Sequence, residues 1–375
     1  MSSSAFYANL SAKSWTYSYE TDISQAQAFH RRLPGYEQTP LVPLHDLAKT
    51  LGIGAIFVKD ESSRLGLPAF KILGASWGTF RAIAEQTGLS LDTSLENVSE
   101  AAKKAGTVLF AATEGNHGRA VARMGKILEV PTHIFMSRFA HKDTCQKIES
   151  EGAQVTVIRG NYDDAVATAF AESEKVSTGL LIQDNAFDGY EQIPAWIVEG
   201  YSTLLFEIQQ QLEAQGRRAT TIVTPIGVGS LGHAVVAYCK SSGRQIEVLT
   251  VEPETAACLH QNLRAGEWST INTSATIMNG LNCGTVSPIS WPVLAKGVDA
   301  SITVSDLECH ESVQYMQDCG INAGPCGGAT LAAIKKAASM ALISGDKLSN
   351  SVMVLLNTEG ARAYTLPHSG LSPKA

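Results

Sequence analysis

Short apolar segments alternate with helical segments along almost the whole chain, and this alternation restricts the possible folds more than any other feature. Apolar runs of this length are typical of strands buried on both faces. Strands that alternate with helices indicate parallel sheets covered by helices, so the predicted fold class is α/β. The predicted strands are 55–60, 107–113, 132–137, 154–160, 180–186, 220–227, 246–252, 300–305 and 351–357, and two predicted helices are 289–297 and 329–342.

Charge and composition exclude several classes of protein. The 375 residues have a formal net charge of −7 and their basic side chains are scattered, so we expect no nucleic-acid partner. No run approaches the roughly 18 apolar residues of a membrane span. Residues 1–20 have neither the basic flank nor the apolar core of a signal peptide. We therefore expect a cytoplasmic protein with no membrane partner.

The cysteines follow no metal-binding or disulfide pattern. There are seven, an odd number, and none forms a C-x-x-C pair. We expect reduced thiols and no metal site.

A glycine-rich turn in "TIVTPIGVGSLGHAVVAYC" lies between a predicted strand and a predicted helix. Backbone N–H groups at such a helix start form a cradle for an anion, most simply a phosphate. The spacing of Gly227, Gly229 and Gly232 is also the G-x-G-x-x-G of dinucleotide-binding proteins, and Glu252 ends the next strand, where a ribose-binding acid is expected. A nicotinamide site is therefore an alternative, as is a turn that needs glycines for packing alone. The second glycine-rich stretch, "INAGPCGGATLAAI", is interpreted as structural or as a loop on the substrate side.

Polar residues also collect after the strand in "VLFAATEGNHGRAVARMGK". Ligands of open α/β sheets bind at the carboxyl ends of strands, so Thr113 to Gly118 are candidates for a ligand site. The alternative is that Thr113 or Asn116 only caps the following helix. A lone histidine such as His117 is more often structural than a catalytic base.

Lys71 stands in "SSRLGLPAFKILGASWG", a stretch of apolar and small residues with no neighbouring carboxylate in the sequence. Burial without a carboxylate lowers the pKa of a lysine and makes it an amine nucleophile that can form a Schiff base with a carbonyl. The alternative is that Lys71 extends to solvent from an amphipathic helix.

Taken together, the order of "SRLGLPAFKILGA", "ATEGNHGRAVA", "PIGVGSLGHAVV" and "LLNTEGA" resembles the fold-type II pyridoxal-phosphate (PLP) enzymes, which include threonine dehydratase, serine racemase and the tryptophan synthase β chain. Within that group, "AFHRRLPGYEQTPLVPL", "QDNAFDGYEQIPAWIVEGY" and "TIMNGLNCG" are most similar to the diaminopropionate ammonia-lyases. The resemblance runs from about Phe29 to Ala361. It implies that pyridoxal 5'-phosphate is the cofactor.

The resemblance also assigns roles to residues. Lys71 would hold the cofactor as a Schiff base and act as a base, Asn116 would bind the ring oxygen, and Thr358 would face the pyridine nitrogen. A neutral hydroxyl there gives a mild electron sink, which suits elimination. The phosphate would be bound by the amides of Gly227, Val228, Gly229, Ser230 and Leu231.

The implied reaction is elimination of ammonia from 2,3-diaminopropionate or a close β-substituted amino acid, with pyruvate and ammonia formed through aminoacrylate. Because Lys71 serves one face of the cofactor, a second acidic residue is needed for the other enantiomer. Asp184 matches one of the family's two acids, whereas Glu114 replaces the aspartate of the family motif T-D-G-N-H-G. A misplaced carboxylate can cost about 100-fold in rate, so Glu114 predicts an altered substrate or stereochemical preference.

Three alternatives to this function stay open at the level of sequence. The aminoacrylate can be captured by a second nucleophile in a β-replacement or biosynthetic enzyme. The chain can be an NAD-dependent dehydrogenase, which leaves Lys71 and Asn116 without a task, or a non-catalytic PLP-binding protein.

The resemblance implies two α/β domains with twisted, mostly parallel sheets and the cofactor in the cleft between them. We expect a large cofactor-binding domain from residues 1–82 and 187–375 and a small domain from 83–186. The polar stretch 85–100 is the best candidate for a boundary. Family members are commonly homodimers. Cys258 and Cys283 would lie near the mouth of the site, where we expect free thiols.

Overall fold

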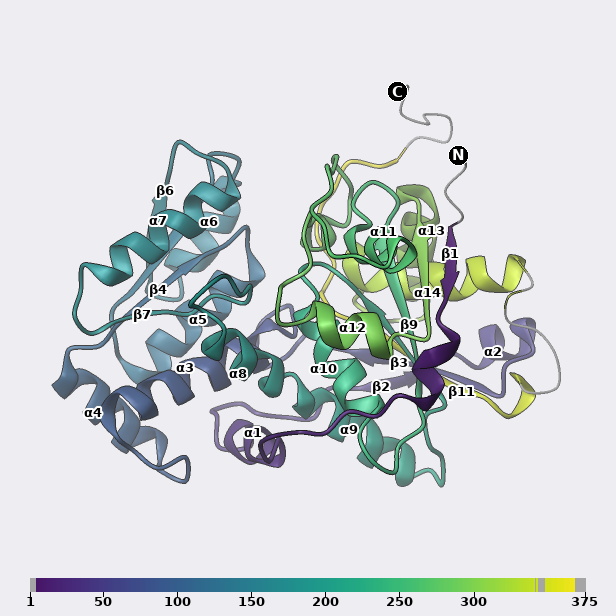
Figure 1. Cartoon of the computed structure of the whole chain (residues 1–375), viewed down its shortest axis with the longest axis horizontal. Helices are drawn as coiled ribbons and strands as arrows, with labels where there is room; N and C mark the ends of the chain where they lie inside the picture. Colours follow the sequence, from purple (N-terminus) through teal and green to yellow (C-terminus); the bar gives the residue numbers. More distant parts are fainter. Residues whose placement is uncertain (1–4, 341, 343–347, 368–375) are drawn as a thin grey trace. The chain divides into compact units, whose positions relative to one another are not determined.

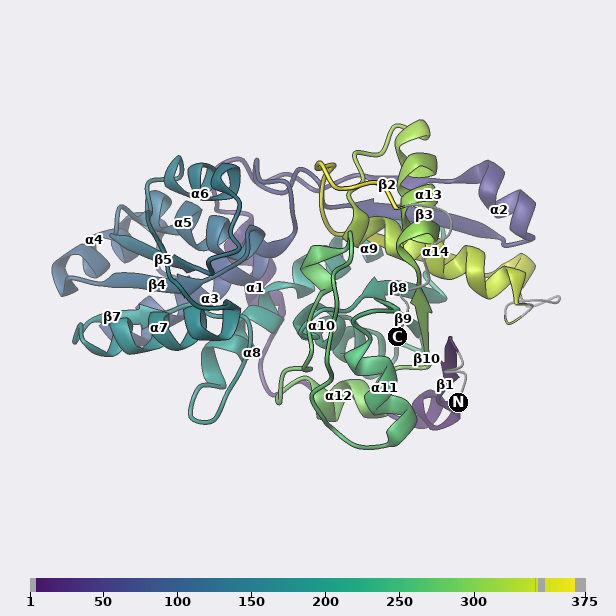
Figure 2. The same cartoon turned by 90° about the horizontal axis from the view of Figure 1, so that it is seen from above.

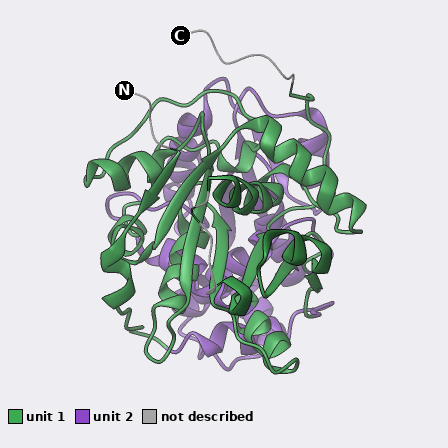
Figure 3. Cartoon of the chain, turned by 90° about the vertical axis from the view of Figure 1, so that its right-hand side faces the viewer, with its two compact units in different colours: residues 1–21, 38–64, 204–375 green, residues 22–37, 65–203 purple. Residues whose placement is uncertain are grey.

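The computed structural model describes residues 5–340, 342 and 348–367, and it divides into two compact units (Figure 3). Unit 1 comprises residues 1–21, 38–64 and 204–375, and unit 2 comprises residues 22–37 and 65–203. Each unit has its own sheet (Figure 1). No helix among the residues that the structure describes is long and apolar enough to cross a membrane.

Unit 1 is built on a seven-stranded sheet in the order β1-β10-β9-β8-β11-β3-β2. The neighbouring strands from β10 to β3 are parallel, and the edge strands β1 and β2 are antiparallel to their neighbours. The strands are β1 (Phe6–Ala8), β2 (Leu41–Pro43), β3 (Ala55–Asp60), β8 (Thr221–Pro225), β9 (Glu247–Pro253), β10 (Ala300–Val304) and β11 (Val352–Asn357).

Helices cover this sheet because its central strands are apolar on both faces. Every residue of β8 and β11 is buried, and α14 packs across β8, β9, β10 and β11. The helices of unit 1 are α2 (His45–Leu51), α10 (Ser230–Cys239), α11 (Cys258–Ala265), α12 (Trp291–Gly297), α13 (Asp306–Asp318) and α14 (Pro325–Ser339), with 3-10 turns η1 (Leu10–Ser14), η2 (Asn279–Leu281) and η3 (Leu348–Asn350). Helix α9 (Ser202–Glu213) begins with the last two residues of unit 2.

Unit 2 contains a four-stranded parallel sheet in the order β6-β5-β4-β7, of which β5, β4 and β7 are labelled in Figure 2. Its strands are β4 (Val108–Ala112), β5 (Thr132–Met136), β6 (Gln154–Val157) and β7 (Gly179–Leu181). Helix α7 packs on Phe135 of β5, and α5 packs on the adjacent residue Ile134, so they cover opposite faces. The helices are α1 (Ser24–His30), α3 (Lys71–Thr87), α4 (Leu95–Ala105), α5 (Asn116–Leu128), α6 (Lys142–Glu149), α7 (Tyr162–Glu174) and α8 (Gln192–Gly200).

The predicted α/β class is confirmed, and every predicted strand is present in whole or in part. The predicted strand 180–186 ends early, at Leu181. Strands β1 and β2 were not predicted, because three-residue edge strands leave almost no pattern in a sequence.

The boundaries between the two compact units lie at residues 21/22, 37/38, 64/65 and 203/204. The predicted domain boundaries lie at 82/83 and 186/187. Helix α3 crosses residue 82 without a break and packs on α5 and α8, so the whole helix belongs to unit 2. Residues 85–100 also lie within unit 2 and include the start of α4. Which stretches form the cofactor-binding domain stays a prediction.

Candidate active site

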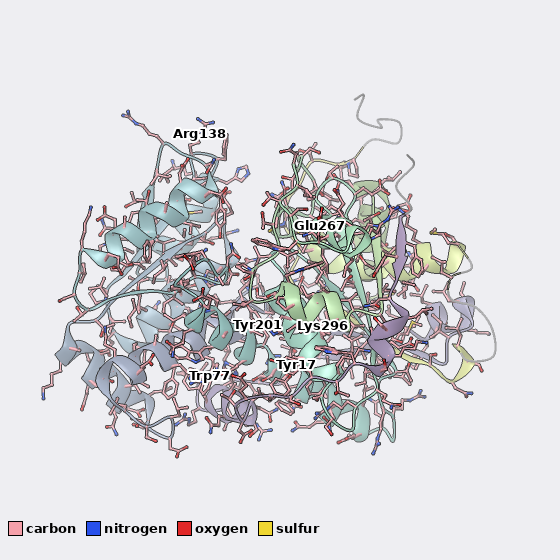
Figure 4. The ribbon with its side chains drawn as sticks, viewed as in Figure 1. Tyr17, Trp77, Arg138, Tyr201, Glu267 and Lys296 are labelled. Atoms are coloured by element: carbon pink, nitrogen blue, oxygen red, sulfur yellow. The ribbon has the colours of Figure 1, made fainter. Side chains whose placement is uncertain are left out.

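Lys71 is the first residue of α3, and its side chain ends beside a carboxylate. Nζ of Lys71 lies 2.5 Å from Oδ2 of Asp184. The same ammonium lies 5.2 Å from the ring centre of Phe70 and 6.0 Å from that of Tyr201, a side chain labelled in Figure 4. The expectation that Lys71 has no carboxylate partner is therefore wrong. Its local sequence is apolar, but the partner comes from a segment far along the chain, after β7.

The environment of the pair keeps Asp184 ionised. The Lys71 side chain is 23% exposed and that of Asp184 is 8% exposed. Burial opposes ionisation of Asp184, yet the charge of Lys71, with a smaller contribution from His117, holds the pKa of this carboxyl well below its usual range. Lys71 must therefore give up a proton before it can act as a nucleophile.

The segment that carries Asp184 follows the end of β7 and is held there by hydrogen bonds of the Gln183 and Tyr190 side chains. Oε1 of Gln183 accepts the N–H of Ala112 at 3.1 Å, so a side chain continues the pairing with β4. The backbone N–H of Gln183 donates to the hydroxyl of Tyr190, which donates to the Leu181 carbonyl. These contacts release the backbone from the strand and direct Asp184 toward α3.

The stretch after β4 combines a capping function with candidate ligand groups. Oγ1 of Thr113 accepts the N–H groups of Gly115 and Gly118 at 2.9 and 3.0 Å, as the capping interpretation predicted. A Cβ at Gly118 would lie 2.3 Å from Thr113, so this close turn requires glycine. Asn116 is the first residue of α5, and Glu114 is exposed in the turn before it.

His117 lies on the first turn of α5 and is nine-tenths buried. Nε2 lies 2.8 Å from the Ile182 carbonyl, and Nδ1 lies 3.9 Å from Oδ2 of Asp184. Burial lowers the pKa of the His117 ring. The charge of Asp184 raises this pKa, and the charge of Lys71 lowers it. The ring is therefore neutral at pH 7.

The glycine-rich turn after β8 is built for close approach of a backbone. Gly229 precedes α10 at φ +93°, a conformation that favours glycine. A Cβ at Gly227 would lie 2.7 Å from the Gly280 carbonyl oxygen, and one at Gly232 would lie 2.4 Å from Ile226. The first N–H groups of α10 have no partner inside the helix. The turn thus offers amides to an anion, and its glycines are also needed for packing.

Glu252 has a structural task instead of the predicted ribose contact. Its carboxyl oxygens accept the N–H groups of Leu259 and His260 at 2.8 and 2.7 Å and thereby cap α11. Burial raises the pKa of Glu252 to about 8. A carboxyl occupied in this way does not take a ribose.

Cys258 and Cys283 both lie beside Gly227. Sγ of Cys258 lies 3.9 Å from the Gly227 carbonyl oxygen, and Sγ of Cys283 would lie 3.3 Å from a Cβ at Gly227. Neither forms a disulfide, and nor do the other five cysteines, all of which belong to the described part of the chain.

Thr358 follows β11, which is parallel to β8 and adjacent to it. Thr358 and the turn of 226–230 therefore share the carboxyl edge of one sheet, and the Thr358 side chain is buried. The second glycine-rich stretch begins α14, where Oε1 of Glu359 accepts the Cys326 N–H at 3.1 Å. A Cβ at Gly327 would lie 1.8 Å from Oδ1 of Asn357, so this stretch is structural.

Two residues that contribute to the site were missed or undervalued. Gln183 was missed as a site residue, although it stands in the predicted strand 180–186 directly before Asp184. His117 was interpreted as structural, and one ring nitrogen is bonded, but the other faces Asp184. Its position in the strand-end motif was the available signal.

Comparison with known proteins assigns the family. Residues 32–359 match the family model "Pyridoxal-phosphate dependent enzyme". The chain belongs to this family. A diaminopropionate ammonia-lyase of Salmonella typhimurium is 36% identical over 289 residues, which are 74% of this chain and 71% of the relative. The corresponding Escherichia coli enzyme is 33% identical over 291 residues, 76% and 73% of the two chains.

A solved structure supports the same assignment. The Escherichia coli diaminopropionate ammonia lyase, in complex with an aminoacrylate-PLP azomethine reaction intermediate, has a TM-score of 0.84 at 29% identity and covers 95% of this chain and 93% of its own. The resemblance to fold-type II enzymes and the predicted cofactor are confirmed. The nicotinamide alternative is wrong, in agreement with the capping contacts of Glu252.

The described residues fit pyridoxal phosphate. The turn of 227–231 offers backbone amides at a helix start, Lys71 offers an amine within a short contact of a buried carboxylate, and Thr358 offers a buried neutral hydroxyl. These are donors for a phosphate, an aldehyde-binding amine and a hydrogen-bonding group for a ring nitrogen.

Proposed function

We propose that the chain is a PLP-dependent ammonia-lyase that eliminates ammonia from 2,3-diaminopropionate or a close β-substituted amino acid and yields pyruvate and ammonia. One observation carries the proposal: in a chain of this family, the amine of Lys71 lies 2.5 Å from the buried carboxylate of Asp184. The identity to two diaminopropionate ammonia-lyases supports the substrate class.

The cofactor would be held by Lys71 at its aldehyde, by Asn116 at its ring oxygen, by Thr358 at its ring nitrogen and by the amides of 227–231 at its phosphate. When bound, pyridoxal phosphate supplies an aldehyde that joins an amine and a ring that delocalises the electron pair left at Cα. The neutral hydroxyl of Thr358 would bind the ring nitrogen without adding charge.

Lys71 has two tasks in this proposal, to hold the cofactor and to move a proton at Cα of the substrate. Both tasks require a neutral amine, which Asp184 can provide by accepting a proton from Nζ at the observed 2.5 Å. Asp184 is the second acid–base group of the site. Loss of the β-amino group as ammonia also consumes a proton, which Lys71 can return.

Glu114 distinguishes this chain from the family motif. A base on one face of the cofactor serves one enantiomer, and Glu114 stands where the motif has the aspartate for the other face. Its side chain is one methylene longer and is exposed in the turn before α5. We propose that the enzyme prefers the L-isomer, because a misplaced carboxylate can cost about 100-fold in rate.

The test is turnover of L- and D-diaminopropionate, serine and threonine by the purified protein, with pyruvate or 2-oxobutyrate measured. We expect pyruvate from L-diaminopropionate, a smaller yield from the D-isomer and none from a Lys71→Ala control. No keto acid from any substrate would contradict the proposal. Bound cofactor without turnover would then indicate a non-catalytic protein, and loss of substrate without keto acid a β-replacement enzyme.

A cytoplasmic homodimer is part of the same proposal and follows from the family resemblance. Light scattering would give twice the mass of the chain, and a monomeric mass would contradict it.

A further inference from the structure

His117 has an open hydrogen-bonding position that the proposed mechanism does not use. Its Nε2 lies 2.8 Å from the Ile182 carbonyl, which can only accept, so the neutral ring carries its proton on Nε2. Nδ1 then presents a lone pair. It is buried, and none of the described residues forms a hydrogen bond with it.

This lone pair faces another acceptor. Nδ1 of His117 lies 3.9 Å from Oδ2 of Asp184, and the same oxygen lies 2.5 Å from Nζ of Lys71. The three groups form a series of histidine, carboxylate and amine within unit 2. Nδ1 of His117 and Oδ2 of Asp184 are both hydrogen-bond acceptors, and one proton can be placed between them.

A proton between His117 and Asp184 is needed when the buried Asp184 carboxylate has no other positive charge beside it. A buried carboxylate that loses its cation is strongly destabilising. Lys71 supplies the positive charge while it is an ammonium. The proposed function, on which this inference rests, requires a neutral Lys71 amine at two points, when it bonds to the cofactor and when it takes a proton from the substrate. Asp184 then needs another partner.

We propose that His117 takes up the proton that Lys71 releases, through Asp184, and carries the positive charge of the series while Lys71 is neutral. One N–H bond of the ammonium breaks, the proton passes to Oδ2 of Asp184, and an N–H bond forms at Nδ1 of His117. No electrons leave or enter the series, and the reverse transfer restores the ammonium.

The observed geometry suits the transfer. The imidazolium keeps its Nε2–H on the Ile182 carbonyl and gains an Nδ1–H that donates to Asp184. A shift of about 1 Å would shorten the 3.9 Å separation to the 2.7–2.9 Å of a charge-assisted hydrogen bond. His117 acts through Asp184 and is therefore a positioning residue.

Four influences set the protonation of His117. Burial lowers its pKa most, the Asp184 charge raises it, the Lys71 charge lowers it, and the hydrogen bond with the Ile182 backbone raises it. Asp184 and Lys71 are the charged groups among these. Removal of the Lys71 charge leaves Asp184 as the only charged neighbour among these. The pKa of His117 therefore reports the state of Lys71.

The test is an NMR pH titration of the full-length protein without added cofactor. The His117 ring resonance is assigned by its loss in His117→Gln, and wild type is compared with Lys71→Met and Lys71→Met/Asp184→Asn. We expect Lys71→Met to raise the His117 pKa by about one unit, a tenfold change in the proton equilibrium. The added Asp184→Asn change should abolish the rise. Lys71→Gln is a second variant in case Lys71→Met misfolds.

His233 is a matched control. It is also a buried histidine whose Nδ1 has no hydrogen bond from the described residues, but it lies in unit 1 and burial alone lowers its pKa to about 4. Its titration should be the same in all variants.

An unchanged His117 pKa in the Lys71 variants, or a rise that persists without Asp184, would overturn the inference. The titration needs neither cofactor nor substrate. If the enzyme turns over substrate but the His117 pKa does not respond to the Lys71 substitutions, this inference alone is contradicted. If the His117 pKa responds but no substrate is turned over, the proposed function alone is contradicted.

Discussion

The two units each contain a cluster of buried charges, and the clusters differ in how completely they are satisfied. In unit 1, Lys59 and Arg64 pair with Glu61 and Glu207, and all four side chains are essentially inaccessible to solvent. In unit 2, Lys71 pairs with Asp184, the lysine stays partly exposed and the adjoining Nδ1 of His117 faces an acceptor.

The cluster of unit 1 uses each donor of its lysine. Nζ of Lys59 donates to Glu207, to the Thr39 carbonyl and to Gln211 at 2.7, 2.8 and 2.9 Å. Arg64 donates to both oxygens of Glu207 and to both oxygens of Glu61. Each of these charges is buried and paired with an opposite charge, so we interpret the network as structural. The pair of unit 2 retains a partly exposed amine and an acceptor, Nδ1 of His117, with no hydrogen bond from the described residues. Acid–base chemistry requires such groups.

The largest expected difference between the clusters appears when the lysine of unit 2 is removed. Lys71→Ala should lower turnover about 10,000-fold, since the variant loses both the cofactor bond and the base. Borohydride reduction should fix cofactor to the wild type at Lys71 and not to the variant. Lys126→Ala, an exposed lysine of α5, is the control and should keep full turnover. Turnover at the wild-type rate in Lys71→Ala would contradict the assignment of a catalytic role to the cluster of unit 2.

Breaking the cluster of unit 1 should affect stability instead. Glu207→Gln leaves Lys59 and Arg64 with an excess of buried positive charge, and we expect a loss of about 3–4 kcal/mol in the free energy of unfolding. Urea denaturation measures it, and Glu213→Gln, an exposed glutamate on the same helix, should cost little. Turnover per folded molecule should stay at the wild-type level. A stable variant with lost turnover would show that this cluster is not merely structural.

Acid should weaken the cluster of unit 1 in a predictable direction. Although burial opposes its ionisation, Arg64 and Lys59 hold the pKa of Glu207 well below its usual value. The stabilisation is therefore complete above the unfolded-state pKa of about 4.5 and is lost as pH falls toward the folded-state pKa. We expect Glu207 to contribute about 3 kcal/mol to the fall in the free energy of unfolding below pH 4.5. If the free energy of unfolding falls equally steeply with decreasing pH in Glu207→Gln, this assignment is contradicted.

The smallest effect concerns the stereochemistry of unit 2. Glu114→Asp restores the residue of the family motif and should raise kcat/KM for D-diaminopropionate about tenfold, because a carboxylate moved by one methylene can regain its alignment. Turnover of the L-isomer, measured as pyruvate in the same assay, should stay nearly constant. Equal changes for both isomers would show that Glu114 does not select between substrate faces.

Much of the site can be predicted from local pattern. The glycines at 227–232 occupy a strand-to-helix turn whose backbone conformation and close packing require glycine, and these constraints are visible in the residue types themselves. Lys71 and Asn116 were predicted from motifs that each lie within a few residues. Gln183 and the capping task of Glu252 could not be predicted, because their partners are set by the pairing of strands and by the position of α11.

The sequence by itself determined the α/β class, the strands that alternate with helices, the family and the identity of its candidate groups, since these depend on periodicity and on short motifs. Only the tertiary structure decided which charges meet. Lys71 appears alone in its apolar stretch, yet the parallel pairing of β4 with β7 directs Asp184 and His117 to the same place. Coulomb interactions act over a few ångströms in space and not along the chain, so the state of a buried lysine depends on contacts that no local pattern contains.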